Sequence, residues 1–124
     1  MSVSRVGIVV ALPSESRTWC RSAVRVGEQQ AIGDQALLAV SGVGEQRAAQ
    51  AAQWLVDAGV SGLVSWGCAA GLAPGLAAGA LCLPDAVVTP DGQRWTTDAA
   101  WRQMLTIALG ELSTSGASLA HASQ

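Results

Sequence analysis

Residues 63–84 read LVSWGCAAGLAPGLAAGALCLP, and this stretch decides the fold. Leu63–Trp66 has the apolar character of a strand buried in a sheet. The strand ends at Gly67–Gly71, a run with almost no side-chain bulk. Backbone N–H groups at such a corner are accessible to a ligand, and ligands of open α/β sheets bind at the carboxyl ends of strands. From the residues alone, Gly67–Gly71 is either a ligand site or a tight turn packed against a helix.

The composition is that of one folded domain. The chain has 124 residues, of which 50% are hydrophobic and 13% are charged, a balance that disfavours disorder. The net charge is −2 and there is no basic run, so we expect no nucleic-acid partner. No apolar stretch reaches the roughly 18 residues of a membrane-spanning helix. The first apolar segment is short and leads into Pro13–Glu15, which is typical of a helix start, so we expect a cytoplasmic protein.

The cysteines and the single histidine predict no metal site. Cys20, Cys68 and Cys82 are odd in number and widely spaced, which fits neither a disulfide framework nor a zinc site. His121 has no companion at metal-ligand spacing. Cys68 lacks a neighbouring histidine that could activate its thiol, so we interpret it as a small buried residue rather than a nucleophile.

Strands and helices alternate along the chain. Strands are predicted at Arg5–Leu12, Val24–Val26, Gln35–Ser41, Val60–Trp66, Ala80–Leu83 and Ala86–Thr89. Helices are predicted at Ser14–Ala23, Gln46–Ala58 and Ala99–Leu112, and turns at Gly27–Gly33 and Pro90–Gly92. Gly59 should end the second helix, and Thr97 or Asp98 should cap the third. Residues 35–66 form a strand–helix–strand unit, for which we expect parallel pairing and a right-handed crossover.

The number of elements is small for a complete doubly wound sheet. Such a sheet usually has five or more strands with helices on both faces, whereas only three helices are predicted here. Loop-like residues 113–118 and a short segment from Leu119 follow the last helix. We therefore expect residues 1–124 to form a single partial domain, the first half of a larger one.

Two further features follow strands at the same edge of the predicted sheet. Ser41–Gly44 opens a helix, so its N–H groups could face an anion, but taken alone we interpret it as an ordinary strand-to-helix turn. Glu15 could act as a general acid or base or bind hydroxyls, or it could only stabilise the helix dipole. Arg94 and Arg102 could meet a phosphate, but we interpret them as solvated surface charges.

Three segments in this order resemble the nucleoside phosphorylase/nucleosidase superfamily, which includes purine and uridine phosphorylases and methylthioadenosine/S-adenosylhomocysteine nucleosidase. They are VGIVVALPSE, SGVGEQRAAQAAQWLVDAG and GLVSWGCAAGLAPGLAAGALCLPDAVV, and they cover most of Val6–Val88. The resemblance implies an α/β fold with three layers and a twisted mixed sheet, truncated after its first half. The LPDAVV edge and DGQRWTTDAAWRQML look most like phosphorylase-like proteins of hopanoid biosynthesis.

The resemblance also implies roles for individual residues. Glu15 matches an acidic catalytic residue that positions water or ribose, and Gly42 and Gly44 match a substrate-binding turn. The matched substrate-binding corner is Cys68, Ala69, Ala70 and Gly71. The implied reaction displaces the base of an adenosine-type nucleoside, with adenosylhopane as the hopanoid candidate, by phosphate or water at C1′. Phosphate is thus a candidate co-substrate, and no other cofactor is expected.

The chain departs from the family pattern at several points. Cys68 replaces a Ser, and a thiol is a weaker hydrogen-bonding partner; Ala70 replaces a Gly, which narrows the approach to the backbone. Ser65 stands where hexameric phosphorylases carry a phosphate-binding Arg. The family's Met-Glu ribose segment and its catalytic Asp have no counterpart. We therefore expect either part of such an enzyme or a non-catalytic remnant or binding module, in a homo-oligomer formed through an exposed sheet edge or helix face.

Overall fold

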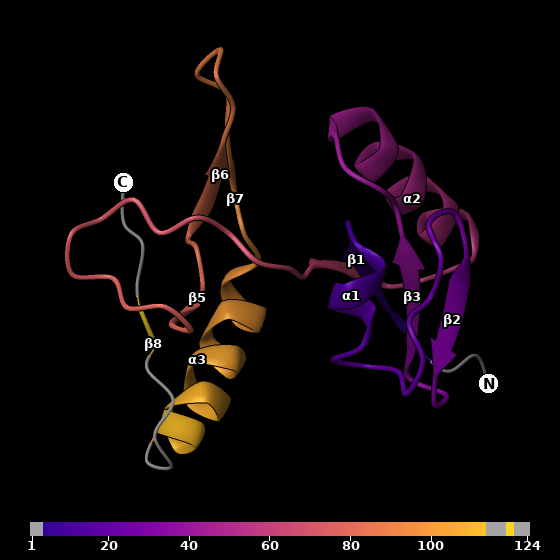
Figure 1. The fold of residues 1–124 in the computed structure, drawn as a ribbon, viewed down its shortest axis with the longest axis horizontal. Coiled ribbons are helices and arrows are strands. Elements are labelled where there is room, and N and C mark those ends of the chain that lie inside the picture. Colours follow the sequence, from indigo (N-terminus) through magenta and orange to yellow (C-terminus); the bar gives the residue numbers. More distant parts are fainter. Residues whose placement is uncertain (1–3, 114–118, 121–124) are drawn as a thin grey trace. The chain divides into compact units, whose positions relative to one another are not determined.

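The computed structural model describes residues 4–113 and 119–120, which fall into two compact units (Figure 1). The first unit is Met1–Ala69 and the second is Ala70–Gln124, and each is described by itself. Within its described residues, the first unit contains a four-stranded sheet in the order β2-β3-β1-β4. Its strands are β1 (Val6–Val10), β2 (Gln29–Ile32), β3 (Ala36–Val40) and β4 (Gly62–Ser65). β1 is parallel to β3 and β4, while β2 is antiparallel to β3, so the sheet is mixed as predicted.

Both faces of this sheet are covered by other parts of the first unit. The buried residues of one face are Ile8, Val10, Val24, Leu38 and Val40. Those of the other face are Leu37 and Ala39, with Leu55 from α2 (Glu45–Asp57). Successive side chains of a strand point to opposite faces, so β3 contributes to both clusters. α2 covers one face, and α1 (Pro13–Ser16) with the segment after it covers the other, which is the predicted three-layer α/β arrangement (Figure 1).

Gly7 allows α2 and β4 to pack closely around β1. A Cβ atom at Gly7 would lie 2.9 Å from Cδ2 of Leu63 and 3.2 Å from Cβ of Leu55. Protein interiors are close-packed, so an extra methyl group here would have to push a neighbouring side chain away. The glycine at the second position of β1 therefore sets how near the helix comes to the sheet.

The predicted helix over Ser14–Ala23 is wrong beyond its first turn, because α1 spans only Pro13–Ser16. Ser16 is fully buried, and its hydroxyl accepts a hydrogen bond from the N–H of Val24 at 2.9 Å. The same hydroxyl donates to the carbonyl oxygen of Pro13 at 2.5 Å. These bonds fold the chain back after one helical turn and bring Val24 into the core.

The outer strand lies later in the sequence than predicted. Gly27–Gly33 was expected to be a turn, yet Gln29–Ile32 forms β2 and pairs antiparallel with β3. Val24–Val26 is not a strand, since Val24 is used in the core. The residues of β2 are mostly exposed, as expected for an edge strand, and their polar character hides the strand from hydrophobic patterning.

The strand–helix–strand prediction is correct in its elements and wrong in its pairing. β3, α2 and β4 occur where expected, and Gly59 follows the helix with a φ of +92°. The two strands are parallel, but β1 lies between them and hydrogen-bonds to both. β1 is therefore the central strand of the three parallel ones.

In its described residues, the second unit contains two small strand pairs and a helix. Its strands are β5 (Leu81–Cys82), β6 (Ala86–Val88), β7 (Arg94–Thr96) and β8 (Leu119–Ala120), and its helix is α3 (Ala99–Ser113). β6 and β7 are antiparallel around the predicted turn at Pro90–Gly92, whereas β5 and β8 are parallel. β7 was not predicted. Asp98 caps α3 as expected, because its carboxylate accepts from the N–H of Trp101 at 2.8 Å.

Arg102 is not the solvated charge that the sequence suggested. Its Nη1 donates to the carbonyl oxygens of Asp85 and Thr97, both at 3.0 Å, and to the Thr97 hydroxyl at 2.8 Å. Its Nε lies 3.5 Å from the Asp85 carboxylate. Arg102 thus joins α3 to the β6–β7 pair, while Arg94 is exposed on β7 as expected. Within the described residues, no helix is long and apolar enough to cross a membrane.

Leu55→Ala should lower the free energy of unfolding of the first unit by about 2–5 kcal/mol, because Leu55 is fully buried between α2 and the sheet. Urea denaturation followed by circular dichroism measures the change. Val43→Ala is the control, since Val43 is 71% exposed and its truncation should change stability by less than about 0.5 kcal/mol. Equal losses in the two variants would contradict the core described above.

Asp98→Ala should destabilise α3 by about 1 kcal/mol through loss of its N-cap. Thermal unfolding of the whole chain, followed by the helical circular dichroism signal, provides the measurement. Asp98→Asn keeps a capping oxygen and should stay close to wild type. An Asn variant as unstable as the Ala variant would show that the cap does not support the helix.

Candidate functional site

The three parallel strands end at one edge of the first unit's sheet. The N–H of Ser41, just after β3, donates to the carbonyl oxygen of Val10 at 2.8 Å. On the other side of β1, the N–H of Trp66 donates to the carbonyl oxygen of Val9 at 2.9 Å. The residues that follow β1, β3 and β4 therefore meet at this edge, which we call the sheet rim.

Glu15 connects the ends of β1 and β4 through its carboxylate. Its Oε1 accepts hydrogen bonds from the N–H groups of Ala11 at 3.2 Å and Leu12 at 2.9 Å. Its Oε2 accepts one from the N–H of Cys68 at 2.8 Å, across 53 positions of sequence. An ionised carboxylate has about four acceptor positions, so these three bonds leave about one for a donor from outside.

α1 holds Glu15 in this position. Pro13 occupies the first helical turn, where its fixed φ is favourable, and the N–H of Glu15 bonds the Leu12 carbonyl at 3.0 Å. The Glu15 side chain turns back to the Leu12 N–H, as the third residue of a capping box does. Because α1 is so short, the carboxylate is fixed by the strand ends as much as by the helix.

The turn after β3 places Gly42 and Gly44 at the same edge. The N–H of Gly42 donates to the carbonyl oxygen of Ala11 at 2.9 Å, which links this turn to the residue that binds Glu15. Gly42 has a φ of +81° and Gly44, the N-cap of α2, a φ of +115°, so both positions favour glycine. Among the hydrogen bonds of the described first unit, none joins Gly44 or Ala69 to Glu15.

Arg47 is a rim residue that the sequence did not identify. A Cβ atom at Gly42 would lie 2.8 Å from Nη1 of Arg47 and 3.0 Å from its Cδ, so this side chain lies over the turn. A cation in the first turn of a helix opposes the helix dipole. That unfavourable placement was the one signal in the sequence that could have drawn attention to Arg47.

The corner after β4 is divided between the two units. Cys68 and Ala69 end the first unit, and Ala70 and Gly71 begin the second. Cys68 is exposed, so its interpretation as a small buried residue is wrong. It is the backbone N–H of Cys68, rather than its thiol, that contacts Glu15.

Trp66 fixes the chain just before this corner. Its ring packs edge-to-face on that of Trp19, with ring centroids 5.4 Å apart and an interplanar angle of 74°. Aromatic pairs of this geometry contribute about 0.5–1.5 kcal/mol beyond the area they bury. The segment after α1 and the end of β4 are thereby held together beside Glu15.

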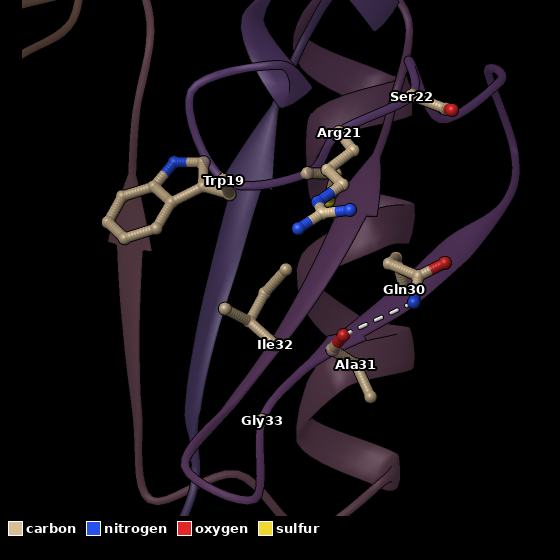
Figure 2. A pocket seen from close by; sticks show the side chains of 8 residues that line it. Trp19, Arg21, Ser22, Gln30, Ala31, Ile32 and Gly33 are labelled. Carbon is tan, nitrogen blue, oxygen red and sulfur yellow. Dashed lines mark hydrogen bonds between the residues drawn. The ribbon is translucent and has the colours of Figure 1, made fainter.

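An open cleft of about 350 Å³ lies elsewhere in the first unit, between β2 and the segment after α1 (Figure 2). Its lining residues are Trp19, Cys20, Arg21, Ser22, Gln30, Ala31, Ile32 and Gly33. The Gln30 amide nitrogen donates a hydrogen bond to the carbonyl oxygen of Ala31 at 3.2 Å (Figure 2). None of the predicted site residues lines this cleft, so the candidate site is the sheet rim.

Comparison with protein families identifies the family of the chain. The family model described as the phosphorylase superfamily matches residues 5–107, and the chain belongs to this superfamily. The predicted membership of the nucleoside phosphorylase/nucleosidase superfamily is confirmed at this level. Neither the curated proteins nor the solved structures contain a significant match. His121 lies outside the described residues, and within those residues no group of three His, Cys, Asp or Glu side chains could hold a metal ion.

Glu15→Ala should speed hydrogen exchange of the Cys68 amide about tenfold or more, since a hydrogen bond to a charged group contributes about 1.5–3 kcal/mol. Amide exchange followed by NMR provides the measurement. Glu45→Ala, which removes an acidic side chain from the first turn of α2, should leave the Cys68 amide unchanged. Equal exchange in wild type and Glu15→Ala would show that the carboxylate does not hold β4.

Proposed function

We propose that the sheet rim forms the ribose side of a nucleoside site in an enzyme that cleaves the N-glycosidic bond of an adenosine-type nucleoside. The observation that carries this proposal is the Glu15 carboxylate, held across the ends of β1 and β4 with about one acceptor position left. Membership of the phosphorylase superfamily supports the reaction class.

The remaining acceptor position gives Glu15 a chemical task. A water bonded there has its oxygen directed away from the carboxylate, toward a ribose bound along the rim. The C1′–N bond breaks with its electron pair leaving on the base, while the water oxygen forms the new C1′–O bond and its proton passes to Glu15. The fixed negative charge also stabilises the positive charge that develops on the ribose. In phosphorolysis a phosphate oxygen attacks instead, and Glu15 holds a ribose hydroxyl.

The narrower parts of the proposal rest on the sequence. The LPDAVV edge and DGQRWTTDAAWRQML support adenosylhopane of hopanoid biosynthesis as the substrate, with Gly42, Gly44, Cys68, Ala69, Ala70 and Gly71 as substrate-binding residues. Phosphate is the proposed co-substrate, and Arg47 adds a guanidinium beside Gly42 that would attract it. We place the enzyme in the cytoplasm as a homo-oligomer.

Glu15→Gln tests the proposed chemistry, because it keeps the size of the side chain and removes the base. We expect release of adenine from adenosine, assayed with and without phosphate, to fall about 10²–10⁴-fold. Glu28→Gln is the matched control, because Glu28 is exposed beside the outer strand and should not alter turnover. Dependence of the wild-type rate on phosphate would distinguish phosphorolysis from hydrolysis. Turnover that is equal in Glu15→Gln and wild type would refute the catalytic role.

The second candidate is a module that binds a nucleoside without cleaving it. The engagement of Glu15 by three backbone N–H groups favours this candidate, since such a carboxylate also serves as a structural tie. Calorimetry with adenosine separates the two. Binding with no base release would support the module, and absence of both binding and release would refute both candidates.

A further inference from the structure

Gly67 lies directly against the Glu15 carboxylate. A Cβ atom added to Gly67 would lie 3.2 Å from Cδ of Glu15 and 3.4 Å from Oε1, and closer still to Oε2. Because Cβ atoms in proteins do not approach an oxygen so closely, any side chain at residue 67 would have to displace the carboxylate. The space that a side chain would fill at this point is the space that Glu15 occupies.

Backbone conformation does not explain this glycine. Gly67 is not among the glycines of the described chain that have a positive φ, whereas Gly42 and Gly44 are. An alanine could therefore adopt the backbone conformation of Gly67 without strain. The requirement at residue 67 is for space alone.

The carboxylate has no easy way to move aside. Its Oε1 is held by the N–H groups of Ala11 and Leu12, and its Oε2 by the N–H of Cys68, the residue next to Gly67. Bonds from N–H groups to an ionised carboxylate are among the stronger hydrogen bonds in proteins, and rotating the side chain breaks at least one of them. On the other side of Gly67, the packing of Trp66 on Trp19 restrains the backbone.

We propose that Gly67 is a positioning residue for Glu15. The missing side chain keeps the carboxylate across the ends of β1 and β4, with its free acceptor position available to a donor. The catalytic meaning of this inference rests on the proposed function, in which that position holds the attacking water or a ribose hydroxyl. A methyl group at residue 67 turns the carboxylate away, so that its free acceptor position no longer meets the water or the ribose hydroxyl. The turn at Gly42 is unaffected.

The test compares Gly67→Ala with the control variant Gly75→Ala. A Cβ atom added at Gly75 meets no atom within 4 Å, and Gly75 does not have a positive φ. In ¹⁵N-labelled protein, the amide signal of Cys68 reports its bond to the carboxylate. We expect Gly67→Ala to move this signal and to speed its hydrogen exchange about tenfold or more, as loss of a charged hydrogen bond requires. Gly75→Ala should leave both unchanged. An unchanged Cys68 amide in Gly67→Ala overturns the proposal.

The double variant Glu15→Ala/Gly67→Ala separates a steric effect on Glu15 from general damage. Without the carboxylate the space is free, so adding the methyl group should alter neither the fold nor Cys68 exchange relative to Glu15→Ala. If Gly67→Ala alone fails to fold, the double variant should recover the circular dichroism spectrum and the melting transition of Glu15→Ala. Equal damage from the alanine with and without the carboxylate overturns the proposal.

Kinetics supply a readout that a purely structural glycine would not give. We expect Gly67→Ala to lower kcat for base release by about as much as Glu15→Gln, with little change in KM for the nucleoside. A change in KM that Glu15→Gln does not share would overturn the positioning role. Absence of base release by the wild-type chain would contradict the proposed enzyme, and the Cys68 amide would still decide the role of Gly67.

Discussion

The pairing of β1 with two parallel neighbours is the constraint on which the first unit depends. β1 bonds to β3 on one side and to β4 on the other, so all three strands end at the same edge. The candidate site residues Glu15, Gly42 and Cys68 come from segments far apart in sequence, and this strand pairing brings them to one edge of the sheet. Glu15 then adds a direct bond between the segments that follow β1 and β4.

Three glycines around this arrangement serve three different physical needs. Gly7 lets neighbouring side chains approach the central strand, and a larger residue there would loosen the layers. Gly42 adopts a positive φ that turns the chain from β3 toward α2. Gly67 has an ordinary φ and leaves room for a carboxylate. The same residue type therefore supports packing, chain reversal and site geometry in one small unit.

Helices and strands with a clear hydrophobic pattern in their own residues could be predicted from the sequence. Those whose bounds depend on tertiary contacts could not. α2 has apolar residues at helical spacing and a glycine stop, and the apolar central strands are equally distinct. β2 is polar and becomes a strand only by pairing with β3, whereas α1 is cut short by the bonds of Ser16. Glu15 was chosen from its place after a strand, but no local pattern reveals that it binds the N–H of Cys68.

The bond between Glu15 and Cys68 also bears on the order of folding. It closes a loop of 53 positions, and contacts of such long range form only after the entropy of closing the loop has been offset. The pairing of β4 with β1 brings Cys68 to the carboxylate and offsets that entropy. A chain in which β4 were not docked would lack the Cys68 donor, and its Glu15 carboxylate would keep only the two donors of the segment after β1.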